Sequence, residues 1–501
     1  MDYILKQKKQ NFLIFMIFIV SIGIKSILIS NDLPLVIDGM DNFTYSTAIN
    51  FYGQLPTEWS PPNNGWPIFV SFWFSLINLE NTLQYMQMQK IISVILSSLI
   101  IIPVYFLCRK FFDEKISLVG SAFFAFDPRI ILNSTLGITE PLFILLGITS
   151  LVIFLRYERK GIFLSFILAS LCTVVRAEGI FLFLTLSILF FIEYRFSKHI
   201  LKTYLPCLAI FILILLPIMD YRMEVSGNDA IFQRVAHGTN EVFIASNESQ
   251  GGKIIEGIEL FIKYLGWIMI PNFLIFLPLG FILFLKERRK ETKFIIIFLI
   301  SSSIPIFYAY FSQAQDTRYL YFLYPIFSLI SLFSVKFFLS KTHKKNLVLT
   351  LMIIGIFSAS IGFYNFQYNN FEKENELNDI AEIVVTEVSG LNFHPSETRY
   401  IRAAQLPTEW PFLFFDEDFK IKSISTKNYD NLEEFIQNSK ESLTHIIVDD
   451  DEKLPEFLKE VYFEEEKFVY LEKVFDSKDS GFKHHVKLFE INFEKFEKQM
   501  N

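Results

Sequence analysis

The sequence predicts a polytopic α-helical membrane protein that carries a C-terminal α/β domain on its outer side. Its 501 residues are 52% hydrophobic and 17% aromatic, so the chain is richer in apolar side chains than a typical soluble domain. The apolar residues form runs of about 20, which is the length that crosses a ~30 Å hydrocarbon core. Residues 366–501 lack such runs and are strongly acidic, which predicts a separate domain there.

About eleven of the apolar runs are predicted to span the membrane. The first of them, after MDYILKQKKQ, is too long for a signal peptide and has no small-residue cleavage motif, so we interpret it as a helix. The short runs 161–175 and 178–194 also allow a second interpretation, as one hairpin of half-penetrating helices. The predicted spans are 11–30, 88–108, 115–127, 139–155, 161–175, 178–194, 203–219, 264–285, 293–311, 318–338 and 346–365.

The orientation of the spans follows from lysine and arginine. Every second connection carries a basic cluster, and basic connections stay in the cytoplasm. The N-terminus is therefore predicted to be cytoplasmic, and the protein to be integral to the cell membrane. The basic clusters are 6–9, 108–115, 156–160, 195–199, 286–293 and 341–345, and the predicted outer segments are 31–87, 128–138, 220–263, 312–317 and 366–501.

Charge separates the two predicted domains. Residues 1–365 carry 30 basic and 23 acidic side chains, or +7, whereas residues 366–501 carry 16 and 30, or −14. The basic side chains of the first domain sit in short clusters between apolar runs, so we expect a lipid bilayer and no nucleic acid as partner. Cys108, Cys172 and Cys207 have no metal-ligand spacing and are predicted to be small buried hydrophobes.

Two outer segments are predicted to be folded. The first outer loop, 31–87, contains the amphipathic stretches TYSTAINFYG and WPIFVSFWFSLI, which suit a membrane interface. The acidic tail alternates charged helical stretches with strand-like runs such as THIIVDD and HHVKLFEINF, a pattern typical of a small α/β domain. We therefore predict a transmembrane catalytic domain at 1–365 and an extracytoplasmic domain at 366–501.

Four acidic residues stand at predicted outer membrane borders. Asp38 and Asp41 follow the first span, and their spacing places both on one side of a helix, where they can supply a general base and its positioning partner. Asp127 and Glu140 bracket the next outer loop. Solvation at the interface, or a favourable helix N-terminus for Glu140, would also explain such acids. An acid this close to hydrocarbon is nevertheless costly and marks a functional candidate.

Two arginines lie where solvation does not explain them. Arg176 stands in CTVVRAEGIFLFL and Arg318 in QDTRYLYFLYP, and an arginine inside a helix bundle needs a partner. Ion pairs with Glu178 and Asp316 would satisfy them. The alternative is a clamp for a phosphate, because a guanidinium matches phosphate oxygens bidentately. Acids and arginines at the outer border of an aromatic-rich bundle suit the transfer of a group carried on a lipid phosphate.

The chain resembles the C-type (GT-C) glycosyltransferases, most closely the dolichyl-phosphate-mannose–protein mannosyltransferase-like group and the aminoarabinose-to-lipid-A transferases. The resemblance covers about 1–340. The first outer loop of that group begins with D-E-x-x-Y, matched by DNFTY with Asp41 and Tyr45, although Asn42 replaces the second acid. Further matches are Glu140 in TEPLF, the R-x-E-G turn at Arg176, Glu178 and Gly179, and the RYL-x-x-x-P start at Arg318, Tyr319, Leu320 and Pro325.

The resemblance implies an inverting transfer of a sugar from a polyprenyl phosphate donor to an acceptor hydroxyl on a protein, glycan or lipid. It implies Asp41 as the base with Asp38 and Glu140 beside it. Arg176 and Arg318 would hold the phosphate, and Tyr45, Asp127, Glu178 and Tyr319 would support them. No cofactor is required if the arginines neutralise the phosphate; a divalent cation held by Asp38, Asp41 and Glu140 is the alternative.

Two other functions fit parts of the sequence. An oligosaccharyltransferase uses a related fold, but it would need a WWDYG-like tail motif, and the tail contains a single tryptophan in PTEWPF. A transporter or scaffold without chemistry would show repeated halves or midplane charges, whereas the suspect charges here lie at the outer border. The prediction that separates these readings is that Asp41, Glu140, Arg176 and Arg318 line one outward cavity.

Overall fold

A computed structural model describes residues 2–29, 33–35, 38–57, 60–61, 63–79, 82–195, 198–229, 231–233, 251–367, 369–389, 399–402, 421–423, 426, 429–440, 443–451 and 454–500. The chain divides into two compact units. The first unit comprises residues 1–30, 37–78 and 86–366, and the second comprises 31–36, 79–85 and 367–501.

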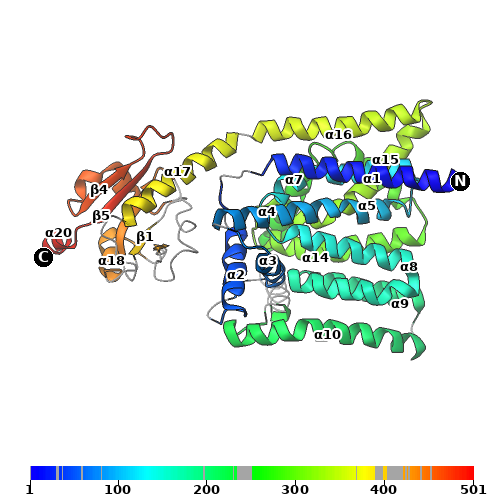
Figure 1. Ribbon diagram of the computed structural model, residues 1–501, viewed down its shortest axis with the longest axis horizontal. Helices are drawn as coiled ribbons and strands as arrows, with labels where there is room; N and C mark the ends of the chain where they lie inside the picture. The colour runs from blue at the N-terminus through cyan, green and yellow to red at the C-terminus, as the bar shows by residue number, and fades with distance from the viewer. Residues whose placement is uncertain are drawn as a thin grey trace. The chain divides into compact units, whose positions relative to one another are not determined.

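The first unit is a bundle of helices that run side by side (Figure 1). Six helices among the described residues are long and apolar enough to cross a membrane, and the bent pair α6–α7 makes a seventh. Its elements are α1 (Asp2–Ile27), α2 (Asp38–Tyr52), α3 (Gly65–Leu76), α4 (Thr82–Leu99), α5 (Ile101–Cys108), α6 (Glu114–Ala125), α7 (Pro128–Ser134), α8 (Glu140–Val175), α9 (Gly179–Tyr194), α10 (Lys198–Ser226), α12 (Gly251–Met269), α13 (Phe276–Leu285), α14 (Lys290–Phe311), η1 (Thr317–Leu323), α15 (Tyr324–Ser340) and α16 (Lys345–Gln367).

The predicted polytopic helical class is confirmed, although several predicted spans are shorter helices than expected. Phe12–Ile27, Lys160–Val175, Gly179–Tyr194 and Phe276–Leu285 are apolar helices of 10–17 residues. The predicted span 264–285 is wrong as a single helix. It is divided between the end of α12 and α13 by the Ile270–Pro271 turn, because proline lacks the N–H that would continue the helix.

Helix α8 folds back on itself as two arms. Ser150 Oγ donates to Ser165 O at 2.7 Å, and Ser165 Oγ donates to Ser150 O at 2.8 Å, contacts that a straight helix could not make across fifteen residues. The second arm therefore returns to the end at which Glu140 begins the first. The interpretation of 161–175 and 178–194 as half-penetrating helices is wrong, because Arg176 lies at that end of the bundle and not halfway along it.

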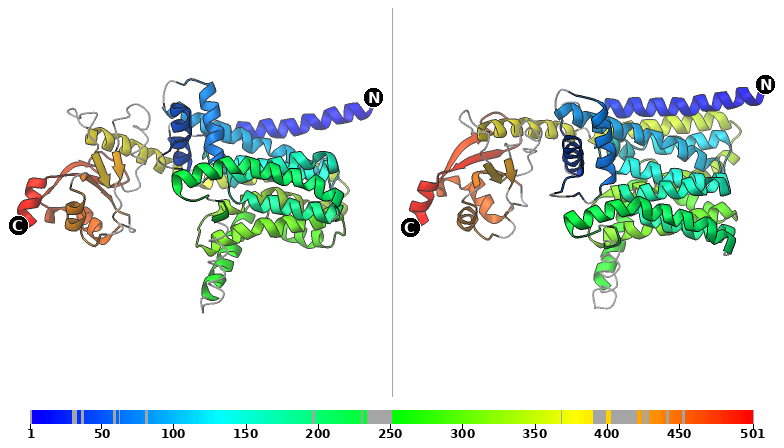
Figure 2. Two further views of the ribbon diagram at one scale, coloured as in Figure 1. Left: turned by 90° about the horizontal axis from the view of Figure 1, so that it is seen from below. Right: turned by 60° about the horizontal axis from the view of Figure 1, so that its bottom comes forward.

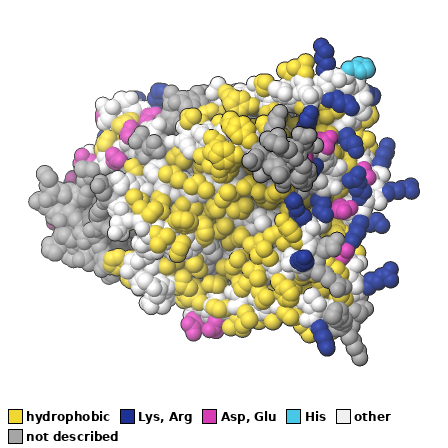
Figure 3. Space-filling view, turned by 45° about the vertical axis from the view of Figure 1, so that its right-hand side comes forward, with side chains coloured by type: hydrophobic (Ala, Val, Ile, Leu, Met, Phe, Trp, Pro, Cys, Tyr) yellow, Lys and Arg dark blue, Asp and Glu magenta, His cyan; other side chains and the backbone are white. Residues whose placement is uncertain are grey.

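Lysine and arginine side chains gather at one end of the bundle, beyond a broad hydrophobic surface (Figure 3). Contacts join the basic connections at this end. Lys115 Nζ donates to Asn346 Oδ1 at 2.8 Å, and Lys290 forms an ion pair with Glu193. The shared end agrees with the predicted alternation of connections; the assignment of that end to the cytoplasm stays a prediction.

Helices α2 and α3 cross the direction of the spans (Figure 1). Gly65 allows the start of α3 to approach α8 closely, because a Cβ at this position would lie 2.7 Å from the backbone of Val175. The indole Nε1 of the fully buried Trp66 donates to Gly137 O at 2.9 Å. The first outer loop is therefore fixed to the ends of the spans near Arg176.

The second unit contains a five-stranded mixed sheet with the order β2-β1-β3-β5-β4. Strand β1 is parallel to β2 and β3, whereas β5 is antiparallel to β3 and β4. Successive residues of β3 point to opposite faces: Ile446 joins one apolar cluster and Ile447 the other. The elements are α17 (Asn369–Ser389), β1 (Arg399–Arg402), β2 (Ile421–Ser423), α18 (Leu432–Asn438), β3 (Leu443–Asp449), α19 (Glu456–Phe463), η3 (Glu465–Lys467), β4 (Leu471–Asp476), β5 (Val486–Ile491) and α20 (Phe493–Met500).

Candidate active site

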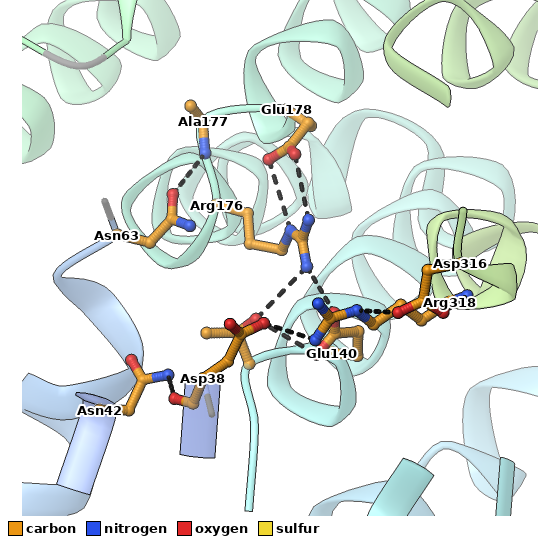
Figure 4. Close-up of polar contacts among 10 residues, drawn as sticks. Asp38, Asn42, Asn63, Glu140, Arg176, Ala177, Glu178, Asp316 and Arg318 are labelled. Atoms are coloured by element: carbon orange, nitrogen blue, oxygen red, sulfur yellow. Dashed lines mark hydrogen bonds and ion pairs between the residues drawn. The ribbon is translucent and has the colours of Figure 1, made fainter. Parts of the chain in front are cut away.

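Four segments bring charged side chains together at the end of the bundle that α2 crosses (Figure 4). They are the first turn of α2, the first turn of α8, the turn between α8 and α9, and the short helix η1 with the residue before it. In each of these segments a helix begins or ends at this end of the bundle. The charged residues therefore belong to helix ends, where unpaired backbone groups and polar side chains meet.

The α8–α9 turn holds Arg176 in a closed set of ion pairs. Arg176 Nη1 lies 2.6 Å from Glu140 Oε1, and Nη2 lies 3.1 Å from Glu178 Oε1. Arg176 Nε donates to Glu178 Oε2 at 3.4 Å. The side chains of Arg176 and Glu140 are only 16% and 6% exposed. All three guanidinium nitrogens of Arg176 thus have carboxylate partners.

The backbone of this turn is also fixed. A Cβ at Gly179 would lie 2.5 Å from Thr173 N, so the glycine of the R-x-E-G pattern permits the tight return of the chain. Ala177 N donates to Asn63 Oδ1 at 3.3 Å, which ties the turn to the loop before α3. Arg176 is therefore positioned both by its partners and by its backbone.

Helix η1 carries Arg318 on its first turn. Asp316 caps this helix by accepting from Arg318 N at 2.9 Å, and its Oδ2 lies 2.7 Å from Arg318 Nε. Arg318 Nη1 lies 2.5 Å from Asp38 Oδ2. The described contacts of Arg318 engage Nε and Nη1 only, and the side chain is 26% exposed. The Nη2 group of Arg318 therefore keeps N–H donors for a ligand.

Asp41 stands one turn along α2 from Asp38 and is exposed. Among the ion pairs of the described residues, none engages Asp41. Partial desolvation and, second, the negative charge of Asp38 raise the pKa of the Asp41 carboxyl above its ordinary value. A raised pKa makes the carboxylate a better proton acceptor, which suits a general base.

A pocket opens between α8, α9, α14 and η1, with an empty volume of about 530 Å³ that includes its open mouth. Its lining combines four charged side chains with mostly apolar ones. The lining residues are Glu140, Phe143, Ile144, Arg176, Glu178, Phe181, Leu182, Ser302, Pro305, Ile306, Arg318, Tyr319 and Phe322. Of the four residues predicted to share one cavity, three line this pocket, and Asp41 is not among the lining residues.

The charge balance of the cluster limits how an anion can bind there. Four carboxylates, those of Asp38, Glu140, Glu178 and Asp316, surround the two guanidinium groups. The net charge is therefore negative, and no general positive field attracts a phosphate. Binding has to rely on directed N–H donors in the fork geometry that matches phosphate oxygens.

Two predicted supporting residues lie outside this pocket. Asp127 is fully buried and caps α7 by accepting from Arg129 N at 3.0 Å; its role here is that of a helix cap. Tyr45 is also buried, and its hydroxyl lies 2.6 Å from that of Tyr221 on α10. Tyr45 thus holds α2, the helix that carries both aspartates, against the end of α10.

The sequence reasoning missed the clamp that α10 forms on the first outer loop. Arg222 is buried and donates from Nη1 to Pro61 O at 2.5 Å and to Asn64 Oδ1 at 2.9 Å. Asn64 in turn donates to the Tyr45 hydroxyl at 3.2 Å. An arginine just after an apolar run was the signal, since the same rule had selected Arg176.

The predicted alternative to phosphate neutralisation by arginine is a divalent cation held by Asp38, Asp41 and Glu140. No group of three histidine, cysteine, aspartate or glutamate side chains converges on one point within the described ranges. The Asp38 and Glu140 carboxylates are held by Arg318 and Arg176. We therefore assign no step of the chemistry to a metal ion.

No family model matches the chain, and no curated protein matches it in sequence. Solved structures do match. ArnT from Cupriavidus metallidurans bound to undecaprenyl phosphate has a TM-score of 0.59 at 9% identity, covering 95% of this chain and 97% of that one. The Archaeoglobus fulgidus oligosaccharyltransferase AglB with an inhibitory peptide and a dolichol-phosphate has a TM-score of 0.59 at 11% identity, covering 89% and 70%.

A second structure of the Archaeoglobus fulgidus oligosaccharyltransferase, in complex with Zn and sulfate, has a TM-score of 0.57 at 12% identity and covers 86% of this chain and 68% of that one. At these identities the likeness shows the fold. The chain shares the fold of ArnT and AglB, and the resemblance predicted from its motifs is confirmed at the level of the fold.

Proposed function

We propose that the protein is an integral membrane glycosyltransferase that takes its sugar from a polyprenyl phosphate donor. One observation carries this proposal: Arg176 and Arg318, from separate elements, line one pocket whose uncharged lining is mostly apolar. This arrangement supports a ligand that is a phosphate at one end and a hydrocarbon at the other. The shared fold with proteins that hold undecaprenyl phosphate and dolichol-phosphate supports the same ligand class.

The donor binds with its phosphate at Arg318 and its first isoprene units against the apolar lining. Arg318 Nη2 supplies the N–H donors, and Tyr319 lies beside it in the wall. Phe143, Phe181 and Phe322 form aromatic surface for the hydrocarbon. Arg176, whose three nitrogens already have carboxylate partners, contributes charge and shape more than direct contact.

The transfer is a single displacement with inversion at the sugar. The acceptor hydroxyl oxygen attacks C1, and the bond from C1 to the phosphate oxygen breaks. The hydroxyl proton passes to the Asp41 carboxylate, while Asp38 keeps α2 in place through Arg318. The polyprenyl phosphate leaves with the electron pair of the broken bond, and N–H donors of Arg318 hold its charge. The positive-inside rule supports a reaction on the extracytoplasmic side.

Dolichyl phosphate mannose is the donor suggested by the sequence resemblance, and the acceptor hydroxyl belongs to a protein, glycan or lipid. Oligosaccharyl transfer is the second candidate, favoured by the likeness to AglB. The nearly complete mutual coverage with ArnT favours the first candidate.

The test is a transfer assay with the purified full chain and a panel of polyprenyl-phosphate sugars and lipid-linked oligosaccharides. Wild type is expected to release polyprenyl phosphate from one of the monosaccharide donors, and Asp41→Asn to be slower by about 10²–10⁴-fold, the usual contribution of a general base. An EDTA arm tests the cation alternative. Equal rates for Asp41→Asn and wild type would reject Asp41 as base, and turnover with oligosaccharide donors alone would favour the second candidate.

A further inference from the structure

Helix α12 is unlike the spans in composition and direction. It is 19 residues long, but Glu256, Glu259 and Lys263 interrupt it, and it is not among the helices apolar enough to cross a membrane. Figure 2 shows it, in green, running across the direction of the spans and projecting from the bundle. A charged helix that lies across the spans cannot be explained as another transmembrane segment.

One face of α12 packs on the bundle next to the candidate site. Gly257, Tyr264 and Ile268 are its buried residues. A Cβ at Gly257 would lie 3.0 Å from Phe311 Cα, so the helix rests directly on the end of α14. The ring of Tyr264 stacks on that of Tyr310, with centroids 5.2 Å apart and planes at 9°.

A second apolar stripe on α12 is not covered by any described part of the chain. Ile255, Ile258 and Ile262 are 59%, 44% and 61% exposed. Their spacing of three and four residues aligns them on one side of the helix, next to the arc that holds Glu259 and Lys263. The apolar arc of α12 is therefore wider than its packing on the bundle requires, which is the pattern of a helix that lies in a membrane interface.

Exposed apolar side chains also follow α12 along the chain. Ile270, Leu274 and Ile275 are 45%, 52% and 67% exposed, and Phe281 and Ile282 on the apolar helix α13 are exposed as well. Because these exposed side chains extend from α12 into an apolar helix of a membrane protein, we infer that the bilayer, and not a protein partner, covers the stripe.

We propose that α12 is an interfacial anchor that inserts Ile255, Ile258 and Ile262 into the outer lipid surface. It also supports, as a brace, the turn that carries Arg318. The brace runs from Tyr264 to Tyr310, whose hydroxyl donates to Asp316 O at 2.9 Å. Asp316 holds Arg318 Nε. The anchoring is argued from the exposed apolar side chains alone. The expected effect of the brace on binding of the polyprenyl-phosphate donor rests on the proposed function.

The anchor is tested by fluorescence quenching of the full chain in phosphatidylcholine nanodiscs. The native cysteines are buried, so Ile258→Cys and Ile262→Cys can be labelled selectively, with Glu256→Cys on the polar arc as the control. Acyl-brominated lipid is expected to quench the labels at 258 and 262 at least twofold more than the label at 256, and aqueous iodide to do the reverse. Equal quenching at all three positions would overturn the anchor, as would protection of 258 and 262 from both quenchers, which would indicate a protein partner.

The brace is tested by kinetics in the same nanodiscs. Tyr264→Ala is expected to raise the KM for the polyprenyl-phosphate sugar at least threefold with an unchanged kcat, and Tyr264→Phe, which keeps the stacked ring, to restore the wild-type KM. An unchanged KM in Tyr264→Ala, or an equal fall in kcat for both variants, would overturn the brace. If wild type transfers no sugar from any polyprenyl phosphate, the proposed function fails and the brace with it, while the quenching result still decides the anchor.

Discussion

Arg176 and Arg318 line the same pocket, yet they are held in different ways. Arg176 has carboxylate partners on all three guanidinium nitrogens and is 16% exposed, whereas Arg318 uses two of its nitrogens and is 26% exposed. An arginine whose three nitrogens are all paired holds the elements around it together, whereas one with an unengaged nitrogen can still receive a ligand. The sequence allows a phosphate clamp or an ion pair at both arginines; under the proposed function, their contacts favour a structural role for Arg176 and phosphate binding by Arg318.

The largest expected effect is on stability, at Arg176. Arg176→Gln leaves Glu140 buried without a cation, and breaking a buried pair from one side costs about 3–5 kcal/mol. The free energy of unfolding of the full chain in detergent measures this loss. The double variant Arg176→Gln, Glu140→Gln is the control and should recover most of it. Equal stability of single and double variants would mean that the pair does not carry the structural role.

The next effect is on activity, at Arg318. Arg318→Gln removes N–H donors aimed at the departing phosphate, and kcat/KM should fall by about 10²–10³-fold, as for the loss of one such donor elsewhere. The free energy of unfolding should fall less in Arg318→Gln than in Arg176→Gln. Arg318→Lys keeps the charge but not the forked N–H donors of the guanidinium, so its kcat/KM should lie between those of wild type and Arg318→Gln. A folded Arg176→Gln protein that loses more activity than Arg318→Gln would reverse the assignment.

A smaller effect is expected where α3 meets the Arg176 turn. Gly65→Ala places a Cβ 2.7 Å from the Val175 backbone, and such overpacking typically costs about 1–3 kcal/mol. Because the clash displaces the turn, the thermal midpoint and kcat/KM should fall together. Gly23→Ala is the matched control, since nothing lies within 4 Å of its Cβ position. Indistinguishable results for the two variants would show that the contact does not position Arg176.

The smallest effect is a shift in the pH profile. Asp41 accepts a proton only when ionised, so kcat/KM should fall as the pH drops through its pKa, which partial desolvation and the charge of Asp38 raise. Asp38→Asn removes the second cause and should move this acidic limb to lower pH, by less than about one unit. The profile of kcat/KM against pH for both proteins measures it. An acidic limb at the same pH in both proteins would contradict either the role of Asp41 as base or its coupling to Asp38.

Much of the site could be predicted because helix ends assigned to the same side of the membrane lie near one another. Glu140, Arg176 and Arg318 each stand at the end of an apolar run, and counting basic connections places those ends on one side. Which carboxylate pairs with which arginine could not be predicted. The contact of Arg318 with Asp38 depends on how η1 packs against α2, and such packing between distant segments leaves no local pattern.

The elements that sequence reasoning misjudged have identifiable physical reasons. The return of α8 is announced in the sequence by the basic connection 156–160 between the predicted spans 139–155 and 161–175, whereas the short lengths of 161–175 and 178–194 alone suggested half-penetrating helices. Asp127 has the same border position as Glu140, yet it turns to cap α7. Composition alone does not tell a capping acid from an ion-paired one.

The central claim is that Arg318 binds the phosphate of a polyprenyl phosphate. Its most direct test is the equilibrium binding of polyprenyl phosphate, and of the matching polyprenol, to the wild-type chain and to Arg318→Gln in identical nanodiscs. Wild type is predicted to prefer the phosphate at least tenfold, and Arg318→Gln to lose that preference while its affinity for the polyprenol is unchanged. Equal affinity of wild type for the two ligands would contradict the claim.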